Sequence, residues 1–328
     1  MTNVLVHITW PVKAWSIPDA YVDQLRSEFP DVSLTHTRDL DAKRTAITHA
    51  DIAFTPALTP ELVDAAPRLR WVHSPAAAVD DLLPLPALRA RGIIVTNSRG
   101  VQSAPIAEHV MAGLLALSRK LDRTILAQRE RRWIQNDLFD DRPWTLEGKR
   151  MTIVGLGSIG TEVARRAQAF GMTIVGVRRH PTREQSPFVE RIVGPDQLDE
   201  ALAGCDVLVL AAPAIAATQR MIGRAQLERL NRGAVLVNVA RAQIVDQDAM
   251  QSALESGQLG GAVLDVFERE PLPQSSALWE RPNVIITPHS SGFRAEHWDR
   301  TAGLFAENLR RFRRGEPLLN VVDTTAGY

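Results

Sequence analysis

Apolar and polar positions alternate over the first hundred residues in short apolar runs separated by amphipathic segments. Strands that alternate with helices in this way are typical of a parallel sheet with crossover helices. The predicted strands of this region are 4–8, 51–55, 71–74 and 93–97. The predicted helices between them are 18–29 and 60–69.

A second alternation begins at Arg150, after a long helical segment and a polar connector. Residues 103–133 predict two helices, and residues 136–149 are polar and rich in turn-forming residues. The strands that follow are apolar on both faces, which is typical of a parallel sheet covered on both sides. The predicted strands are 151–155, 173–177, 206–212, 234–240, 261–267 and 283–288. Residues 294–315 predict a final amphipathic helix.

Length and charge narrow the classes of protein. A chain of 328 residues is too long for one ordinary core and favours two domains. Lys and Arg number 38, as do Asp and Glu, so no net charge attracts nucleic acid or a membrane surface. The single cysteine, Cys205, lies in an apolar run and is interpreted as a buried strand residue. Without a disulfide, a membrane span or a signal peptide, we expect a cytoplasmic protein.

A glycine motif follows the first strand of the second series. The sequence GLGSIG at 155–160 fits G-x-G-x-x-G and opens a helix, the context that predicts a dinucleotide site. The first glycine permits a tight turn, the second lets backbone amides approach a pyrophosphate, and the third lets the helix pack on the strand. The helix N-terminus adds a positive dipole end. The predicted contacts are Gly155, Leu156, Gly157, Ser158, Ile159 and Gly160.

Two arginines stand where an NAD-binding chain usually has a carboxylate. Arg178 and Arg179 end the next strand, and no Asp or Glu occurs from Gly171 to Arg183. An acidic side chain there would bond the ribose 2′-hydroxyl of NAD, whereas an arginine accommodates the 2′-phosphate of NADP. The pair therefore favours NADP, with NAD possible if both arginines are surface residues.

Three polar segments follow later strands, and each contains a residue suited to acid–base chemistry or anion binding. Arg241, Glu270 and His289 should meet where strands end in a doubly wound sheet. An arginine holds a carboxylate with two charge-assisted hydrogen bonds, and a histidine exchanges a proton near neutral pH. A neighbouring carboxylate stabilises the imidazolium form. Together the three residues predict reduction of a 2-oxo acid. No spacing of histidines predicts a metal site.

With these segments in view, nearly the whole chain resembles the D-isomer-specific 2-hydroxyacid dehydrogenase family, and in particular glyoxylate/hydroxypyruvate reductases. The motifs that carry the resemblance are GLGSIG, APIAEH at 104–109, NVARAQIVD at 238–246, LDVFEREP at 264–271 and TPHSSG at 287–292.

The resemblance implies a fold and a set of roles. It implies two doubly wound parallel-sheet domains, with a Rossmann cofactor domain at 101–291 inserted into a flavodoxin-like substrate domain at 1–100 and 292–328. It implies a homodimer joined through the cofactor domain, and a small 2-oxo acid such as glyoxylate or hydroxypyruvate, reduced to the D-2-hydroxy acid. Arg241 would hold the substrate carboxylate, His289 would donate or accept the proton, and Glu270 would tune His289. Further cofactor contacts are expected at Pro213, Thr218, Ala240, Asp265 and Ser291, with Asp265 orienting the nicotinamide carboxamide.

Two positions depart from the family pattern. Ala242 follows the catalytic arginine where glycine is usual, and it would be strained if its φ were positive. Ala78 replaces a usual glycine in the loop Ala77–Asp80, whose amides at Ala77 and Ala78 are expected to bind the substrate carboxylate. His109 is interpreted as a packing or interdomain histidine.

Two alternative functions remain open at this point. One is a dinucleotide-sensing binding protein like the corepressor branch of the superfamily, which retains the catalytic set. The other is a formate- or phosphite-type dehydrogenase. Formate dehydrogenases of the superfamily pair the histidine with glutamine, so Glu270 argues against that activity.

Overall fold

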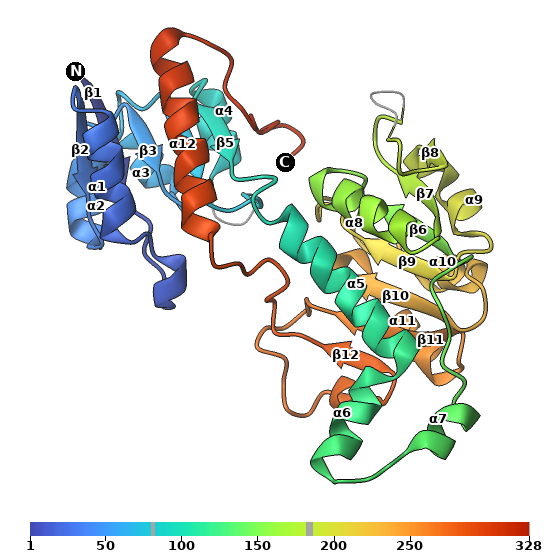
Figure 1. Ribbon diagram of the computed structural model, residues 1–328. Helices are drawn as coiled ribbons and strands as arrows, with labels where there is room; N and C mark the ends of the chain where they lie inside the picture. The colour runs from blue at the N-terminus through green and yellow to red at the C-terminus, as the bar shows by residue number, and fades with distance from the viewer. Residues whose placement is uncertain (80–82, 182–185, 328) are drawn as a thin grey trace. The chain divides into compact units, whose positions relative to one another are not determined.

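The chain folds into two α/β units, each built on one parallel sheet (Figure 1). The computed structural model describes residues 1–79, 83–181 and 186–327. Unit 1 comprises Met1–Gln102 and Arg294–Tyr328, and unit 2 comprises Ser103–Phe293. The expectation of two parallel-sheet α/β folds is confirmed. The division points lie beside the boundaries expected after residues 100 and 291.

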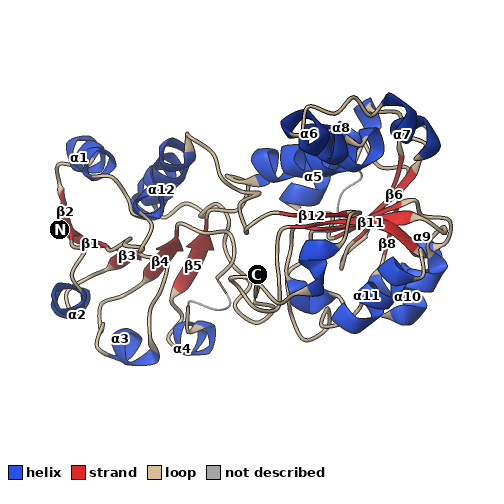
Figure 2. Ribbon diagram, turned by 90° about the horizontal axis from the view of Figure 1, so that it is seen from below, coloured by secondary structure: helices blue, strands red, loops and turns tan. Residues whose placement is uncertain are grey.

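Unit 1 contains a five-stranded sheet in the order β2-β1-β3-β4-β5, the flavodoxin-like arrangement. The strands are β1 (Thr2–Val6), β2 (Val32–His36), β3 (Ile52–Phe54), β4 (Trp71–Ser74) and β5 (Ile94–Asn97). Helices α1 (Asp19–Glu28) and α12 (His297–Arg314) cover one face of the sheet (Figure 2). The other face is covered by α2 (Leu40–Ile47), α3 (Pro60–Asp64) and α4 (Leu85–Ala90).

Alternation along the strands explains these two layers. In β1, Val4 and Val6 pack with Phe305 of α12, whereas Leu5 between them packs with Leu88 of α4 on the opposite face. Successive strand side chains point to opposite faces, so an apolar strand needs a helical cover on each side.

Unit 2 contains a seven-stranded sheet in the order β12-β11-β10-β9-β6-β7-β8. The strands are β6 (Arg150–Val154), β7 (Thr173–Val177), β8 (Arg191–Val193), β9 (Val207–Leu210), β10 (Ala234–Asn238), β11 (Leu259–Leu264) and β12 (Val284–Ile286). The first strand of the unit, β6, lies between β7 and β9, so the strand order reverses beside it. This is the Rossmann arrangement, in which ligands bind at the carboxyl ends of strands beside the reversal.

Helices cover both faces of this sheet as well (Figure 2). One face carries α5 (Ser103–Arg119), α6 (Leu121–Arg129) and α8 (Ser158–Ala169). The other carries α9 (Leu198–Leu202), α10 (Arg224–Arg229) and α11 (Gln247–Glu255). A further short helix, α7 (Gln135–Asp140), follows α6.

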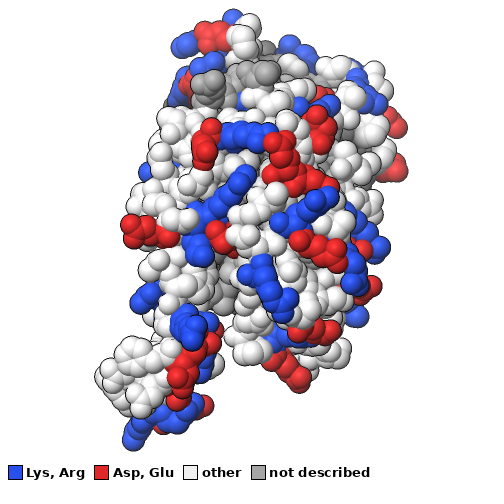
Figure 3. Space-filling model, turned by 90° about the vertical axis from the view of Figure 1, so that its right-hand side faces the viewer, with Lys and Arg blue, Asp and Glu red and all other residues white. Residues whose placement is uncertain are grey.

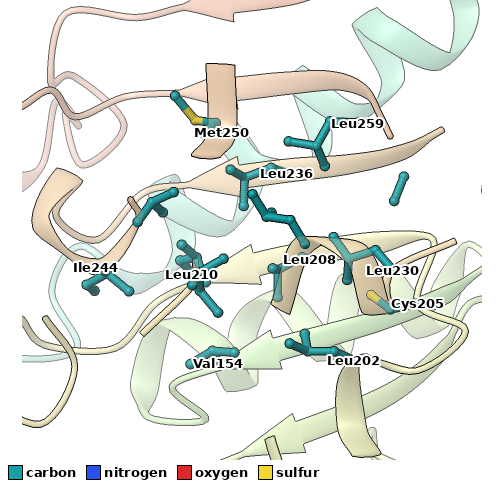
Figure 4. Packing of buried hydrophobic residues seen from close by; sticks show 14 of the residues in the cluster. Val154, Leu202, Cys205, Leu208, Leu210, Leu230, Leu236, Ile244, Met250 and Leu259 are labelled. Carbon is teal, nitrogen blue, oxygen red and sulfur yellow. The ribbon is translucent and has the colours of Figure 1, made fainter. Parts of the chain in front are cut away.

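The core of unit 2 includes the single cysteine (Figure 4). Cys205 is fully buried near Leu202, Leu208 and Leu230. Its thiol contacts the carbonyl of Val207 at 3.1 Å, and burial raises the pKa of the thiol. Its burial is therefore confirmed, but its interpretation as a strand residue is wrong, since β9 begins two residues later at Val207.

Several elements differ from the sequence-based expectation. Helices α2 and α4 were not predicted, and α3 ends at Asp64, whereas the expected helix extended to residue 69. The predicted connector 136–149 is partly helical, since α7 spans Gln135–Asp140. None of its residues is buried, so no apolar periodicity marked it. The strands β2 and β8 were not predicted, because both lie at sheet edges and carry polar residues. The two helices expected over 103–133 are confirmed, and Lys120, with a φ of 58°, separates them.

Candidate active site

The glycine motif forms the turn between β6 and α8, at the point where the strand order reverses. Gly155 has a φ of 100°, and a Cβ there would lie 2.4 Å from the backbone nitrogen of Ala212, after the neighbouring strand β9. A Cβ at Gly160 would lie 2.3 Å from the carbonyl oxygen of Gly155. Both glycines are therefore required by close backbone packing.

The middle glycine has a different environment. Gly157 is the N-cap of α8. A Cβ at this position would have no heavy atom within 4 Å apart from those of its chain neighbours and its own helix. The first turn of the helix, with Ser158 and Ile159, thus presents backbone N–H groups and a positive dipole end to open space. Leu156 is buried against Gly176 and fixes the turn from behind. This arrangement fits the pyrophosphate of a dinucleotide.

The arginine pair lies beside this turn. The carbonyl of Val177, the last residue of β7, accepts hydrogen bonds from the N–H groups of Gly155 at 2.9 Å and Leu156 at 3.3 Å. Arg178 follows immediately; it is half-buried and contacts the carbonyl of Pro181 at 3.3 Å through Nη2. Arg179 is exposed. Arg178 and Arg179 therefore directly follow the residue that bonds to the glycine turn.

The three predicted catalytic residues follow three adjacent strands. Asn238 of β10 is in register with Leu264 of β11, which is in register with Ile286 of β12. Arg241 and His289 each lie three residues beyond the end of their strand, and Glu270 lies in the loop after β11. The parallel register brings all three segments to one edge of the sheet.

His289 and Glu270 form a direct pair. Nδ1 of His289 lies 2.8 Å from Oε2 of Glu270, and Oε1 of Glu270 accepts the backbone N–H of Phe267 at 2.9 Å. The side chains of His289 and Glu270 are 50% and 37% exposed, so the pair is accessible to a ligand. Because Nδ1 is engaged by the carboxylate, Nε2 is the ring nitrogen that does not face Glu270.

Arg241 is held by the backbone around the end of β10. Its Nη1 contacts the carbonyl of Ala240 at 2.8 Å, and its own carbonyl accepts from the amide Nδ2 of Asn238 at 3.0 Å. Oδ1 of Asn238, which is buried, accepts the N–H of Ala240 at 3.0 Å. Asn238 therefore fixes the turn that carries the arginine, a role that sequence reasoning missed.

The strain considered at Ala242 does not arise. Ala242 begins a short 3-10 helix, Ala242–Ile244. Among the described residues, the non-glycine residues with a left-handed φ are Lys120, Arg131, Arg142, Arg220, His289 and Asn320. Ala242 is not one of them, so its backbone accepts alanine as readily as glycine.

The remaining predicted cofactor residues of unit 2 lie in loops at the carboxyl ends of strands. Thr218 closes the loop after β9, because its hydroxyl donates to the carbonyl of Pro213 at 2.7 Å and accepts the N–H of Ile215 at 2.9 Å. Ala240 is buried beside Arg241. Asp265 and Ser291 are bonded to each other, since the N–H of Ser291 donates to Oδ2 of Asp265 at 3.0 Å.

The predicted substrate loop belongs to unit 1. Ala77 and Ala78 follow β4, and the carbonyl of Ala77 accepts from Nδ2 of Asn97 at 2.6 Å, which ties the loop to β5. Asp80, the last residue of the predicted loop, lies outside the described residues.

His109 has a specific polar partner, which its interpretation as a packing or interdomain residue did not foresee. Its Nε2 lies 3.1 Å from the hydroxyl of Thr287, two residues before His289. The two residues are 178 positions apart, so no local pattern could have linked them.

Two kinds of feature are absent from the described ranges. No group of three or more His, Cys, Asp or Glu side chains there could hold a metal ion. No helix in the same ranges has both the length and the apolar character to cross a membrane. Positive and negative side chains are interspersed over the face in Figure 3.

Comparison with known proteins gives consistent matches. Residues 111–291 match the family model described as D-isomer specific 2-hydroxyacid dehydrogenase, NAD binding domain. A glyoxylate reductase of Korarchaeum cryptofilum is 38% identical over 80% of this chain and 79% of the relative. A D-isomer specific 2-hydroxyacid dehydrogenase of Xanthobacter autotrophicus, solved with NADPH and MES, is 29% identical, with a TM-score of 0.83 and full coverage of both chains. An NADPH-dependent glyoxylate/hydroxypyruvate reductase of Sinorhizobium meliloti, solved with NADP and sulfate, is 25% identical, with a TM-score of 0.81 and full coverage of both chains.

Proposed function

The chain belongs to the D-isomer specific 2-hydroxyacid dehydrogenase family, and from that premise we propose that it reduces a small 2-oxo acid to the D-2-hydroxy acid with NADPH. The observation that carries the proposal is the pairing of His289 Nδ1 with Glu270 Oε2 at 2.8 Å. The names of the relatives direct the choice of substrate to glyoxylate and hydroxypyruvate.

In this mechanism each residue has one task. The bound dinucleotide would supply the hydride that reaches the carbonyl carbon. His289 donates a proton from Nε2 to the carbonyl oxygen as negative charge develops there. Glu270 keeps the imidazole oriented and stabilises its protonated form.

Arg241 would bind the substrate carboxylate. A guanidinium binds a carboxylate through two parallel hydrogen bonds, which orients the neighbouring carbonyl group as well as attracting the charge. The backbone amides of Ala77 and Ala78 would supply further donors to the same carboxylate.

The cofactor contacts follow the glycine turn. Gly157 and the first turn of α8 would hold the pyrophosphate, and the loops with Pro213, Thr218 and Ala240 would border the dinucleotide. The positions of Arg178 and Arg179 beside the turn support a preference for NADPH, since a 2′-phosphate attracts guanidinium groups. The two solved relatives that carry NADPH or NADP support the same preference.

The first experiment compares initial rates of glyoxylate and hydroxypyruvate reduction with NADPH and NADH at equal concentration. We expect turnover with both substrates and a higher kcat/KM with NADPH. Faster turnover with NADH would retain the reaction and refute the cofactor preference. No turnover with a wide panel of 2-oxo acids would refute the proposed function.

The arginine pair is tested separately. The double variant Arg178→Ala/Arg179→Ala should weaken NADPH much more than NADH, because only NADPH carries the 2′-phosphate. Arg229→Ala is the matched control, since Arg229 on α10 is exposed and pairs with Asp199 at 3.6 Å. Equal losses for both dinucleotides would mean that the pair has a structural role.

We also propose that the protein is a homodimer joined through the segment 121–139 of unit 2. Large apolar side chains of this segment are exposed to solvent, and Trp133 is 89% exposed. The exposed set is Leu121, Ile125, Leu126, Trp133 and Phe139. Helix α7 stands away from the sheet of unit 2 in Figure 1. An apolar set of this size supports burial against a second copy.

The dimer is tested by light scattering on the eluted protein. Leu126→Glu/Trp133→Ser should give a monomer, because a charge and a polar group would replace apolar side chains at the interface. Leu40→Glu is the matched control, since Leu40 is equally large and 64% exposed but lies in unit 1. A dimer that persists in the double variant would exclude this segment as the interface.

A further inference from the structure

The loop that carries His289 is wrapped around one buried carboxylate. Asp265 is 1% exposed. Its Oδ1 accepts the hydroxyl of Thr287 at 2.6 Å and the N–H of Ser290 at 2.9 Å, and its Oδ2 accepts the N–H of Ser291 at 3.0 Å. These bonds fall on both sides of His289 in the sequence, so the carboxylate holds the loop before and after the histidine.

The backbone of His289 needs such support. Its φ is 51°, a left-handed conformation that non-glycine residues adopt rarely and at a cost in free energy. Its N–H donates to the carbonyl of Thr287 at 3.0 Å, which closes a tight turn. In this conformation the imidazole pairs with Glu270 through Nδ1 at 2.8 Å, so a change in the backbone here would move the ring.

A second histidine completes the arrangement. Nε2 of His109, on α5, lies 3.1 Å from the Thr287 hydroxyl. That hydroxyl has a single hydrogen and lies 2.6 Å from Oδ1 of Asp265 and 3.5 Å from the carbonyl of Leu264, and neither oxygen can donate. Because the shorter bond to the carboxylate takes the hydrogen, the hydroxyl accepts a hydrogen from His109. His109 is thus the donor, through Nε2–H, and the direction of every bond in the chain from His109 through Thr287 to Asp265 is fixed.

We infer that His109, Thr287 and Asp265 are positioning residues for His289. The inference rests on the proposed function. His109 holds the threonine hydroxyl in the orientation that serves the carboxylate, and the carboxylate holds the amides on the far side of His289. A residue on α5 and the residues directly after β11 and β12 thereby maintain the left-handed backbone of the proton donor without touching the substrate. Asp265 would then have two roles, the support of this loop and the expected contact with the nicotinamide.

The test uses paired substitutions in the full chain. Thr287→Val removes the hydroxyl and keeps the branched shape, and Thr287→Ser keeps the hydroxyl. His109→Phe removes the donor, and His109→Gln retains an amide N–H near the same position. We expect Thr287→Val and His109→Phe to lower kcat for glyoxylate by about tenfold or more, with KM, NADPH affinity and Tm little changed. The Ser and Gln variants should recover most of kcat.

The double variant His109→Phe/Thr287→Val adds a further check. If the two residues act in one chain of hydrogen bonds, the double variant should be no slower than the slower single variant. Losses that multiply, or a His109→Phe protein with the wild-type kcat, would overturn the inference. Losses that accompany a lower Tm and weaker NADPH binding, and are not recovered by Ser or Gln, would also overturn it.

A readout independent of turnover separates this inference from the proposed function. Hydrogen exchange should be slow at the amides of Ser290 and Ser291 in the wild type, because they bond a buried carboxylate, and faster in Thr287→Val and His109→Phe. Unchanged exchange in both variants would overturn the inference. If the wild-type protein reduced no 2-oxo acid, the exchange result would still decide whether the chain holds this loop.

Discussion

Replacing Gly157 by alanine is expected to preserve the fold and to weaken dinucleotide binding. A Cβ at this position would meet nothing within 4 Å, and the backbone, with φ −95° and ψ −155°, lies in an extended conformation open to alanine. Alanine is a poorer N-cap than glycine, so the expected loss in free energy of unfolding is below about 1 kcal/mol.

The effect on binding should be larger. The added methyl group would occupy the open space over the first turn of α8, where phosphate oxygens would approach the backbone N–H groups. Hydrogen bonds to a charged group contribute about 1.5–3 kcal/mol each. Losing one of them would weaken NADPH binding by about 10- to 100-fold.

Gly160→Ala is the matched control, because it adds the same methyl group to the same motif in a crowded place. Its Cβ would lie 2.3 Å from the carbonyl oxygen of Gly155 and 3.1 Å from Cγ2 of Ile153. The backbone of the turn cannot give way cheaply, so α8 must shift from β6. Overpacking of this kind costs about 1–3 kcal/mol or more, and we expect a lower Tm.

The two variants are compared by thermal unfolding without dinucleotide and by fluorescence titration with NADPH. Gly157→Ala should keep its Tm and lose affinity, whereas Gly160→Ala should lose Tm. Wild-type NADPH affinity in a folded Gly157→Ala protein would refute the placement of the pyrophosphate at this turn. A Tm that falls as far as that of Gly160→Ala would refute the reading of Gly157 as unhindered.

Three further outcomes are expected. Arg241→Lys should raise KM for glyoxylate and lower kcat, because an ammonium cannot form the two-pronged contact; unchanged steady-state kinetics would assign the carboxylate to another group. Burial lowers the pKa of His73 to about 3. As the pH falls below 6.5, the imidazole of His73 therefore binds a proton in the unfolded chain before it does so in the folded protein. The free energy of unfolding should decrease by up to about 5 kcal/mol by pH 3 for this reason. Acid titrations followed by circular dichroism should show a shallower decline for His73→Asn than for the wild type. Burial also lowers the pKa of Lys43 to about 8, so the wild type should gain stability from pH 8 to 10.5. Lys43→Met should therefore have a free energy of unfolding at pH 7 that is higher by about 1–3 kcal/mol, measured by denaturant titration. The carbonyl of Ala57 would still be hydrogen-bonded in this variant, because it accepts from the hydroxyl of Thr55 at 3.1 Å. A less stable variant would contradict this expectation.

Local patterns were sufficient for the parts of the fold whose residues have one dominant environment. Inner strands of unit 2 are apolar on both faces, as in β9, where Leu208 and Val209 enter opposite cores. Such runs predict covered parallel strands whatever surrounds them. The glycine motif was likewise predictable, because its three glycines are all explained by the geometry of one local turn between β6 and α8.

Elements whose formation depends on distant partners were not predictable. The edge strand β2 has three polar residues among five and is fixed by its register with β1. Helix α7 buries no residue and therefore leaves no apolar stripe in the sequence. His109 lies on a helix, and its partner Thr287 follows a strand 178 residues away. In each case the decisive contact is set by the topology of the sheet, which a single sequence does not state.

Backbone conformation near the candidate site was also not predictable from the sequence. The family pattern directed attention to Ala242, because glycine is usual there. That residue begins a 3-10 helix and has no left-handed φ. The strained residue is His289, whose φ is 51°. Strain persists in a folded protein only where neighbouring bonds over-determine the backbone, and the bonds that Asp265 accepts from residues 287–291 meet that requirement. On the inference made above, the buried carboxylate of Asp265 holds the backbone of the histidine, while the carboxylate of Glu270 contacts its ring at Nδ1.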